Sequence, residues 1–251
     1  MMMYDKLPVV LLMGMASARQ DSINCQIASY VQAHMDDLSG IGIVELAKRC
    51  HSGTSSISRF CKEIGLQDFA ELKELLAGNS LRFQRTDHYA DHVIESIGHA
   101  ADSVSLQAVR SFCHDLDRFT KVAIFGILKG AGIVFNLKTD LLMLSKPVFT
   151  TMSFHEQLEY LHKAGKDTLI LLFSHTGSYF EYVEARTLSK NRPKIYMVAP
   201  AGTVPDPAVD TYIYFESVRD QISHPYQMQY IAGLIAQEYA ALHPAVSRIW
   251  K

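Results

Sequence analysis

The sequence predicts a small all-α domain of the helix-turn-helix type, followed by an α/β domain with a doubly wound, mostly parallel, five-stranded sheet. Two observations support this prediction. Between Ile43 and Gly65, apolar residues recur at helical spacing on both sides of a glycine-containing break. After Lys121, short apolar runs alternate with helical stretches, a pattern typical of a parallel sheet covered on both faces.

The segment from Ile43 to Gly65 reads as two short helices. The residues at helical spacing are Ile43, Leu46, Ala47 and Cys50 in the first helix, and Ile57, Phe60, Cys61 and Ile64 in the second. His51-Ser52-Gly53 interrupts the pattern, and Ser52 or Gly53 can cap the second helix. Gly65 stands where a glycine commonly ends a helix.

If the apolar residues face inward, the second helix presents hydroxyl and basic side chains outward. Small hydroxyls allow a helix to lie close in the major groove, and Arg and Lys contact phosphates and base edges. The predicted DNA-binding residues are Lys48, Thr54, Ser55, Ser56, Ser58, Arg59 and Lys62. Paired amphipathic helices also occur in many helical domains, so periodicity alone leaves a purely structural role open.

The same segment resembles the N-terminal domain of the RpiR-type transcriptional regulators, over about the first third of the chain. The matching residues are Leu46, Ala47, Ile57, Ser58, Arg59, Phe60, Gly65, Phe69, Glu71, Leu72 and Lys73. The resemblance implies binding to a double-stranded DNA operator. The turn differs from the family, because His51-Ser52-Gly53 replaces the usual Gly-Val-Ser and so lacks a buried valine and a serine cap.

Charge and composition limit how DNA can be bound. The 251 residues carry a formal net charge of −2, and 48% are hydrophobic, as in an ordinary globular protein. Residues 1–80 hold seven basic and nine acidic side chains, again a net charge of −2. DNA binding must therefore depend on a local basic patch, for which Lys48, Arg49, Arg59 and Lys62 are the candidates.

The cysteines and the N-terminus bear on the cellular compartment. Cys25, Cys50, Cys61 and Cys113 have no metal-like spacing and suggest no disulfide framework, so we expect no metal or cofactor and a reducing cytoplasm. Leu7–Met15, followed by Ala16-Ser17-Ala18, is similar to a secretory signal, but the segment before it is only weakly basic. We interpret it as a first helix that packs on the motif. No stretch is long enough to span a membrane.

Three regions are predicted along the chain: a helix-turn-helix domain over residues 1–78, a linker and connecting helix over 79–105, and the α/β domain over 106–251. Further helices are expected at 22–35, 69–76, 89–101, 106–116 and 223–242. The five strands are expected at 121–126, 147–151, 168–174, 194–200 and 211–215. The last helix is mostly apolar, which fits either the core or a subunit interface.

Ligands of an open parallel sheet bind at the carboxyl ends of the strands. Two strands here end in suitable loops, Phe125–Gly132 and Phe173–Glu181. In the second loop Ser174, Thr176 and Ser178 offer hydroxyls, and Gly177 allows close approach of a ligand to the backbone. Because a helix follows, its free N–H groups make this an anion site, most naturally for phosphate, although a simple capping turn has the same composition.

The second loop also resembles the second motif of the sugar isomerase (SIS) domain, Ser-x-Ser-Gly-x-Thr. Here the motif reads Ser174-His175-Thr176-Gly177-Ser178-Tyr179. RpiR-type regulators join this domain to the helix-turn-helix in the same order. The resemblance implies a phosphosugar effector, with Gly126, Lys129, Gly130, Ser174, His175, Thr176, Gly177 and Ser178 as the binding residues.

Both loops depart from the family patterns. The first loop is usually Gly-x-Gly-x-Ser, whereas this chain has Leu128 and Gly130 in place of the second glycine and the serine. Tyr179 replaces the final threonine of the second loop. Two hydroxyl donors are therefore missing, and we expect Lys129 to compensate with an ammonium group and His175 with a further donor.

The sequence therefore favours a transcription factor that senses a phosphosugar and acts as a homodimer or higher homo-oligomer, with no membrane partner. One alternative is a phosphosugar isomerase, which needs a general base; the candidates are His155, Glu181, Glu184 and His224. Another is a SIS dimerisation module that has lost its ligand, which the altered loops favour. Conversion of a phosphosugar would indicate the enzyme, whereas thermal stabilisation without conversion would indicate the sensor.

Overall fold

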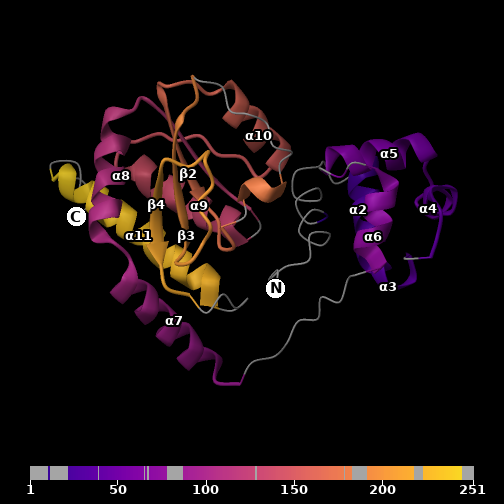
Figure 1. The fold of residues 1–251 in the computed structure, drawn as a ribbon, viewed down its shortest axis with the longest axis horizontal. Helices are drawn as coiled ribbons and strands as arrows, with labels where there is room; N and C mark the ends of the chain where they lie inside the picture. The colour runs from indigo at the N-terminus through magenta and orange to yellow at the C-terminus, as the bar shows by residue number, and fades with distance from the viewer. Residues whose placement is uncertain are drawn as a thin grey trace. The chain divides into compact units, whose positions relative to one another are not determined.

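A computed structural model of the chain describes residues 11, 22–38, 40–64, 66, 68–77, 87–127, 129–177, 179–182, 191–217 and 223–244. It describes their side chains except those of residues 155, 181, 182, 223 and 224. The main division of the chain into two compact units lies after residue 85 (Figure 1). Each unit is considered by itself.

The first unit is helical. Its described helices are α2 (Ile23–Ala33), α3 (Met35–Leu38), α4 (Ile43–Arg49), α5 (Thr54–Glu63) and α6 (Phe69–Ala77). Of the eight apolar residues predicted at helical spacing, six are buried in its core, and Ile43 and Ile64 are partly buried and pack against it. The six are Leu46, Ala47, Cys50, Ile57, Phe60 and Cys61. Leu11 is also buried there, whereas the rest of Leu7–Met15 lies outside the described residues. The periodicity therefore identified the inner face of both helices correctly.

The second unit is an α/β domain. It contains α7 (Tyr89–Ser103), α8 (Leu106–Arg118), β1 (Lys121–Gly126), α9 (Lys129–Met143), α10 (Phe154–Lys163), β2 (Thr168–Phe173), the 3-10 turn η1 (Tyr179–Tyr182), β3 (Lys194–Pro200), β4 (Thr211–Phe215) and α11 (Ser223–Leu242). The four strands are parallel, in the order β1-β2-β3-β4. Every residue of β2 is buried, as expected for an inner strand covered on both faces.

Helices cover both faces of the sheet, as a doubly wound fold requires. Ile124, Leu171 and Val198 point to one face, into a core shared with α8, α9 and α11. On the opposite face Phe125 packs edge-to-face against Tyr160 of α10, with ring centroids 5.5 Å apart. The predicted fold class is therefore confirmed.

The expected strand at 147–151 is not a strand in the structure. Phe149 instead forms an isolated parallel bridge with Ala123 of β1. The Phe149 N–H donates to the Val122 carbonyl, and the Phe149 carbonyl accepts from the Ile124 N–H, both at 2.9 Å. Pro147 has no N–H to extend the ladder, so the pairing stays short. The prediction of five strands is corrected to four strands and one bridge.

This bridge defines the topology of the sheet. Phe149 pairs with one edge of β1, and β2, which follows it in the chain, pairs with the other edge. The chain therefore leaves β1 toward one edge of the strand and returns to its other edge with β2, the arrangement called a topological switch point. Such a switch point is where doubly wound sheets place their ligands.

The long helix α11 belongs to the core of the second unit. Its Met228, Ile231 and Ile235 are buried in the core that α11 shares with the sheet. Helices α7, α8 and α9 contact α11. Gln227 Nε2 donates to the Ser96 carbonyl of α7 at 2.9 Å. We placed α7 in the connecting segment, but it packs within the second unit; the limits of the three predicted regions otherwise stay predictions.

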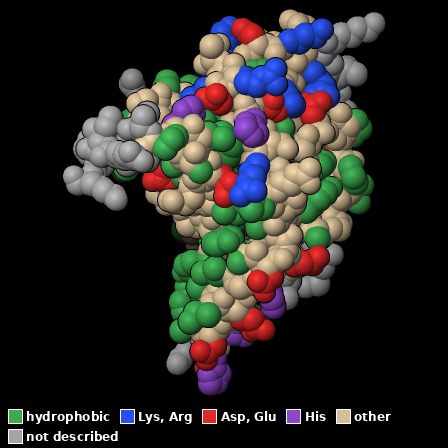
Figure 2. Space-filling model, turned by 90° about the vertical axis from the view of Figure 1, so that its left-hand side faces the viewer, with side chains coloured by type: hydrophobic (Ala, Val, Ile, Leu, Met, Phe, Trp, Pro, Cys, Tyr) green, Lys and Arg blue, Asp and Glu red, His purple; other side chains and the backbone are tan. Residues whose placement is uncertain are grey.

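The surface of the second unit is mixed in character. On the face shown in Figure 2, hydrophobic side chains gather in the lower half and Lys and Arg in the upper half. The exposed apolar side chains of α7 and α11 include Tyr89, Ile94 and Tyr226. In the described part of the chain, no helix is long and apolar enough to cross a membrane.

The four cysteines are free thiols. Cys50, Cys61 and Cys113 are buried, and burial raises the pKa of Cys61 and of Cys113 to about 12. These thiols are therefore neutral and unreactive at physiological pH, as expected of small core residues.

Candidate functional site

The outer face of α5 is the candidate DNA-reading surface. Ile57 and Phe60 anchor the helix with no exposed surface, so the opposite side faces solvent. Of the residues predicted to bind DNA, Lys48, Thr54, Ser55, Ser58, Arg59 and Lys62 are exposed, and Ser56 is half-buried. Hydroxyls and basic groups thus share one accessible helix face, as a major-groove reader requires.

The basic patch is smaller than the sequence suggested. Arg49 Nε lies 2.8 Å from Glu45 Oε1, one helical turn earlier in α4. The hydrogen bond from Arg49 lowers the pKa of Glu45, so this carboxylate stays ionised and offsets the charge of Arg49. Lys48, Arg59 and Lys62 remain as the candidate phosphate and base contacts.

The junction of α4 and α5 is held mainly by backbone hydrogen bonds. The Ser52 N–H donates to the Ala47 carbonyl at 2.8 Å, and the His51 N–H to the Lys48 carbonyl at 3.1 Å, the Schellman pattern. His51 occupies the position that favours glycine, with φ of 49°. Gly53 caps α5 without a side-chain bond. The Ser52 hydroxyl is buried with no hydrogen-bond partner among the described groups.

The second candidate site lies at the switch point of the sheet. Gly126 and Phe173 pair in register as the last residues of β1 and β2, so the loops after them start side by side. A Cβ built on Gly130 would lie 3.5 Å from the Phe173 carbonyl oxygen. The two loops expected to bind the effector therefore meet in the structure.

Close packing requires a glycine at position 126 of the first loop but not at position 130. A Cβ on Gly126 would come within 2.8 Å of the Gly130 carbonyl group, so only glycine fits beneath the start of α9. A Cβ on Gly130 would make only ordinary contacts. Lys129, the first residue of α9, has an exposed side chain, and Leu128 lies outside the described residues.

The second loop is built around Gly177. Its φ is 76°, and a Cβ there would lie 2.1 Å from Cγ2 of Thr203, which follows β3. The Gly177 N–H donates to the Ser174 carbonyl at 3.2 Å, and the Ser174 N–H to the Val198 carbonyl at 3.0 Å. Ser174 and His175 are each 6% exposed, and Thr176 is half-buried. Ser178 lies outside the described residues.

Gln157 of α10 connects the two loops. Its Nε2 donates to the Gly126 carbonyl at 3.1 Å and to the Thr151 carbonyl at 2.8 Å. Its Oε1 accepts from the Tyr179 hydroxyl at 2.7 Å. Burial raises the pKa of Tyr179 well above its ordinary value, so the hydroxyl stays protonated and donates. Tyr179 thus points into the protein, and its hydroxyl does not serve a ligand.

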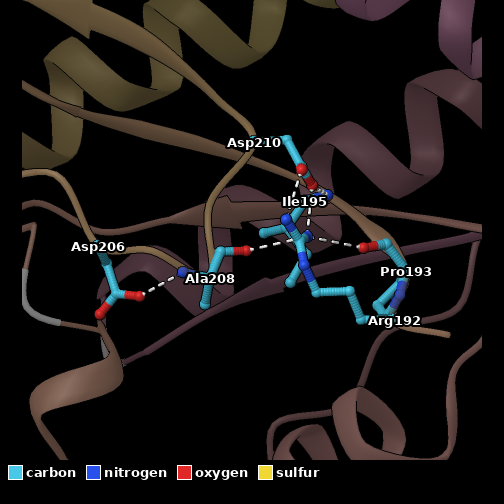
Figure 3. A network of polar contacts seen from close by, with 6 residues as sticks. All are labelled: Arg192, Pro193, Ile195, Asp206, Ala208 and Asp210. Atoms are coloured by element: carbon cyan, nitrogen blue, oxygen red, sulfur yellow. Dashed lines mark hydrogen bonds and ion pairs between the residues drawn. The ribbon is translucent and has the colours of Figure 1, made fainter. Parts of the chain in front are cut away.

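A second polar network lies at the other end of the sheet (Figure 3). Arg192 binds Asp210 with both terminal nitrogens, at 2.7 and 2.6 Å, just before β3 and β4 begin. Asp210 also accepts from the Ile195 N–H at 2.8 Å. Burial raises the pKa of Asp210, but the bonds from Arg192 and Ile195 outweigh this effect and hold it below its ordinary value. This network joins the amino ends of two strands, away from the candidate site.

The structure thus brings Gly126, Gly130, Ser174 and Gly177 to one edge of the sheet, as predicted. Sequence reasoning missed Gln157 and Thr203, which shape both loops from elsewhere in the chain. Gln157 belongs to no recognisable motif, so the sequence contained no signal for it. Thr203 follows the next strand, where a third loop of the carboxyl edge was to be expected.

Four residues were the candidate bases of an isomerase. Glu184 lies outside the described residues, and the side chains of His155, Glu181 and His224 are not described. Within the described part of the chain, no cluster of three or more His, Cys, Asp or Glu side chains could hold a metal ion.

Part of the chain matches a known family of protein domains. Residues 17–81 match the family model of the helix-turn-helix domain, rpiR family. An uncharacterised HTH-type transcriptional regulator of Caldanaerobacter subterraneus is 23% identical over 180 residues, which cover 66% of this chain. The chain spans 64% of the length of this curated relative.

Two solved structures share the fold. The NanR protein of Vibrio vulnificus, complexed with ManNAc-6P, superposes with a TM-score of 0.55 at 15% identity, covering 96% of this chain and 94% of NanR. An Escherichia coli CFT073 protein in complex with a phosphosugar gives a TM-score of 0.52 at 15% identity, covering 71% of this chain and 94% of that protein.

The family match and the fold describe different parts of the chain. A segment that matches the rpiR-family helix-turn-helix domain precedes an α/β domain, and the chain shares its fold with NanR. Residues 17–81 are thus similar to the helix-turn-helix domain of the rpiR family, and the chain is similar over part of its length to an HTH-type transcriptional regulator.

Proposed function

We propose that this protein is a cytoplasmic transcriptional regulator that binds a DNA operator through α5 and senses a phosphorylated sugar in its SIS domain. The observation that carries the proposal is the meeting of two glycine-containing loops at the switch point of the sheet, in a chain that begins with an rpiR-family helix-turn-helix. The phosphosugars bound by the two structural relatives support the choice of effector class.

In this proposal the loops bind the phosphate through backbone and hydroxyl groups. The first turn of α9 follows the carboxyl end of β1, where the positive end of a helix favours an anion, and Ser174 and Thr176 add hydroxyls from the second loop. Lys129 contributes a positive charge at the first turn of α9. Replacement of Lys129 by alanine should then weaken phosphosugar binding, and an unchanged affinity would remove Lys129 from the site.

The DNA contacts are proposed for Lys48, Thr54, Ser55, Ser56, Ser58, Arg59 and Lys62. If Arg59 binds a guanine with two hydrogen bonds, Arg59→Ala should weaken operator binding by roughly 1–3 kcal/mol and relax specificity at one base. A uniform loss across DNA sequences would make it a phosphate contact. Two half-sites one helical turn apart require a symmetric protein, so we expect a homodimer.

A thermal-shift screen of the full chain against phosphorylated sugars and amino sugars, with inorganic phosphate as the control, tests the effector class. A sugar that raises Tm well above phosphate supports the sensor and names its pathway. A flat panel would contradict phosphosugar sensing. Product analysis in the same samples separates sensing from turnover, because an isomerase would convert the sugar whereas we expect no conversion. Anisotropy with labelled operator DNA then measures how the sugar changes DNA affinity.

A further inference from the structure

We infer that Gln157 and Tyr179 form a positioning pair that holds the two loops of the candidate effector site at a set separation. The inference rests on the proposed function only for the identity of the ligand. Gln157 stands on α10, outside both loops, and bonds the last residue of β1 and the turn that follows the second loop. Gln157 belongs to neither of the loop motifs from which the site was predicted, whereas Tyr179 stands at the last position of the second motif, where the family has threonine.

The pair is fully enclosed. Gln157 and Tyr179 both have an exposed fraction of 0%. Both donor hydrogens and the acceptor oxygen of the Gln157 amide are engaged, at 3.1, 2.8 and 2.7 Å. A buried polar group that loses its partner is strongly disfavoured, so movement of one loop away from the other breaks a bond that water cannot replace.

The departure of Tyr179 from the SIS motif is explained by this contact. A threonine hydroxyl lies close to its own backbone, whereas the tyrosine ring carries its hydroxyl deep enough to reach Gln157 on another helix. The substitution therefore exchanges a possible ligand contact for a link between the loops. Loops already held in place lose less conformational entropy on binding, so the link favours affinity without touching the ligand.

The test compares backbone hydrogen exchange in the ligand-free full chain and in Tyr179→Phe, which keeps the ring and removes only the hydroxyl. Loss of a buried bond should speed exchange by about tenfold in peptides covering residues 124–131 as well as residues 172–182. Gln157→Leu should produce the same pattern from the other partner. Faster exchange confined to 172–182 would overturn the inference, because the hydroxyl would then stabilise only its own loop.

Asp210→Asn is the matched control. It weakens a partly exposed charged network at the amino ends of β3 and β4, shown in Figure 3, without contact to either loop. Its exchange should rise around residues 192–196 and 208–212, with the two loops unchanged. If the loops also exchanged faster in Asp210→Asn, general destabilisation would account for the faster exchange in Tyr179→Phe. The inference of a positioning pair would then be overturned.

Binding gives the second readout. Glucose 6-phosphate and inorganic phosphate are titrated into the wild-type chain, Tyr179→Phe and Asp210→Asn by calorimetry. For each of the two that the wild type binds, we expect about tenfold weaker affinity in Tyr179→Phe and no change in Asp210→Asn. Unchanged affinity in Tyr179→Phe overturns the inference. If the wild type binds neither compound but exchange in both loops still responds, the positioning pair stands, and the thermal-shift panel decides whether another phosphosugar is the effector.

Discussion

The turn between α4 and α5 and the second loop of the α/β domain both depart from the family patterns that they resemble, with opposite structural consequences. In the turn, His51 takes a left-handed conformation and the Ser52 hydroxyl is buried without a bond among the described groups. In the loop, Tyr179 is buried and hydrogen-bonded to Gln157. The first departure lowers stability, whereas the second is compensated by a residue 22 positions away. A departure from a motif therefore has no fixed effect on stability, because the effect depends on the residues that surround it.

The largest expected effect comes from returning the loop to the family residue. Tyr179→Thr removes a fully buried ring and leaves the Gln157 oxygen unpaired, which should lower the free energy of unfolding by about 3–5 kcal/mol. Urea denaturation followed by circular dichroism measures it. Tyr214→Thr is the control, since Tyr214 is half-buried beside Tyr212 and should cost only about 1 kcal/mol. Equal losses in the two variants would contradict the comparison.

Gly177→Ala should lower stability by about 2–4 kcal/mol, because the left-handed φ strains alanine and its methyl group would overlap Thr203. Adding Thr203→Gly should recover the part of the lost stability that is due to overlap, whereas the part due to backbone strain should remain. Gly132→Ala in α9, where a Cβ meets open space, should instead stabilise the protein by up to about 1 kcal/mol. The melting temperatures of the three variants separate the contributions of overlap, backbone strain and helix propensity.

In the turn between α4 and α5, a return to the family residues is expected to raise stability rather than lower it. Replacing His51-Ser52-Gly53 by Gly-Val-Ser removes the left-handed histidine and the buried hydroxyl, and it adds a side-chain cap to α5. Together these changes should stabilise the first unit by roughly 2 kcal/mol. The Gly53→Ser step has room, because a Cβ there would lie 3.5 Å from the Ser55 hydroxyl. A lower melting temperature of the first unit would show that the turn is not strained.

The smallest effect on stability is expected for Gly130→Ser, within about 0.5 kcal/mol, because its Cβ makes only ordinary contacts. The new hydroxyl restores the family donor at the first loop and should tighten phosphosugar binding by up to about tenfold. Gly132→Ser, two residues further along α9, is the control and should leave affinity unchanged. Equal affinity of Gly130→Ser and the wild type would place the phosphate elsewhere.

Much of the architecture could be predicted from local pattern. The spacing of Ile57, Phe60 and Cys61 identified the buried face of α5, and the apolar runs identified β1 to β4. The run at 147–151 misled us, because its composition suits a strand while Pro147 limits its pairing. The loops after β1 and β2 could be located from the sequence because each one directly follows the apolar run of its strand.

The sequence by itself determined the order of the two domains, the inward and outward faces of the helix-turn-helix, and the two loops of the candidate site. These features depend on periodicity and on neighbours in the chain, which the sequence displays directly. Only the tertiary structure decided that Tyr179 turns inward to Gln157, that Thr203 excludes a side chain at Gly177, and that Gly130 has room for one. Those outcomes depend on atoms from distant segments that meet only after folding, and no local pattern records the distance between them.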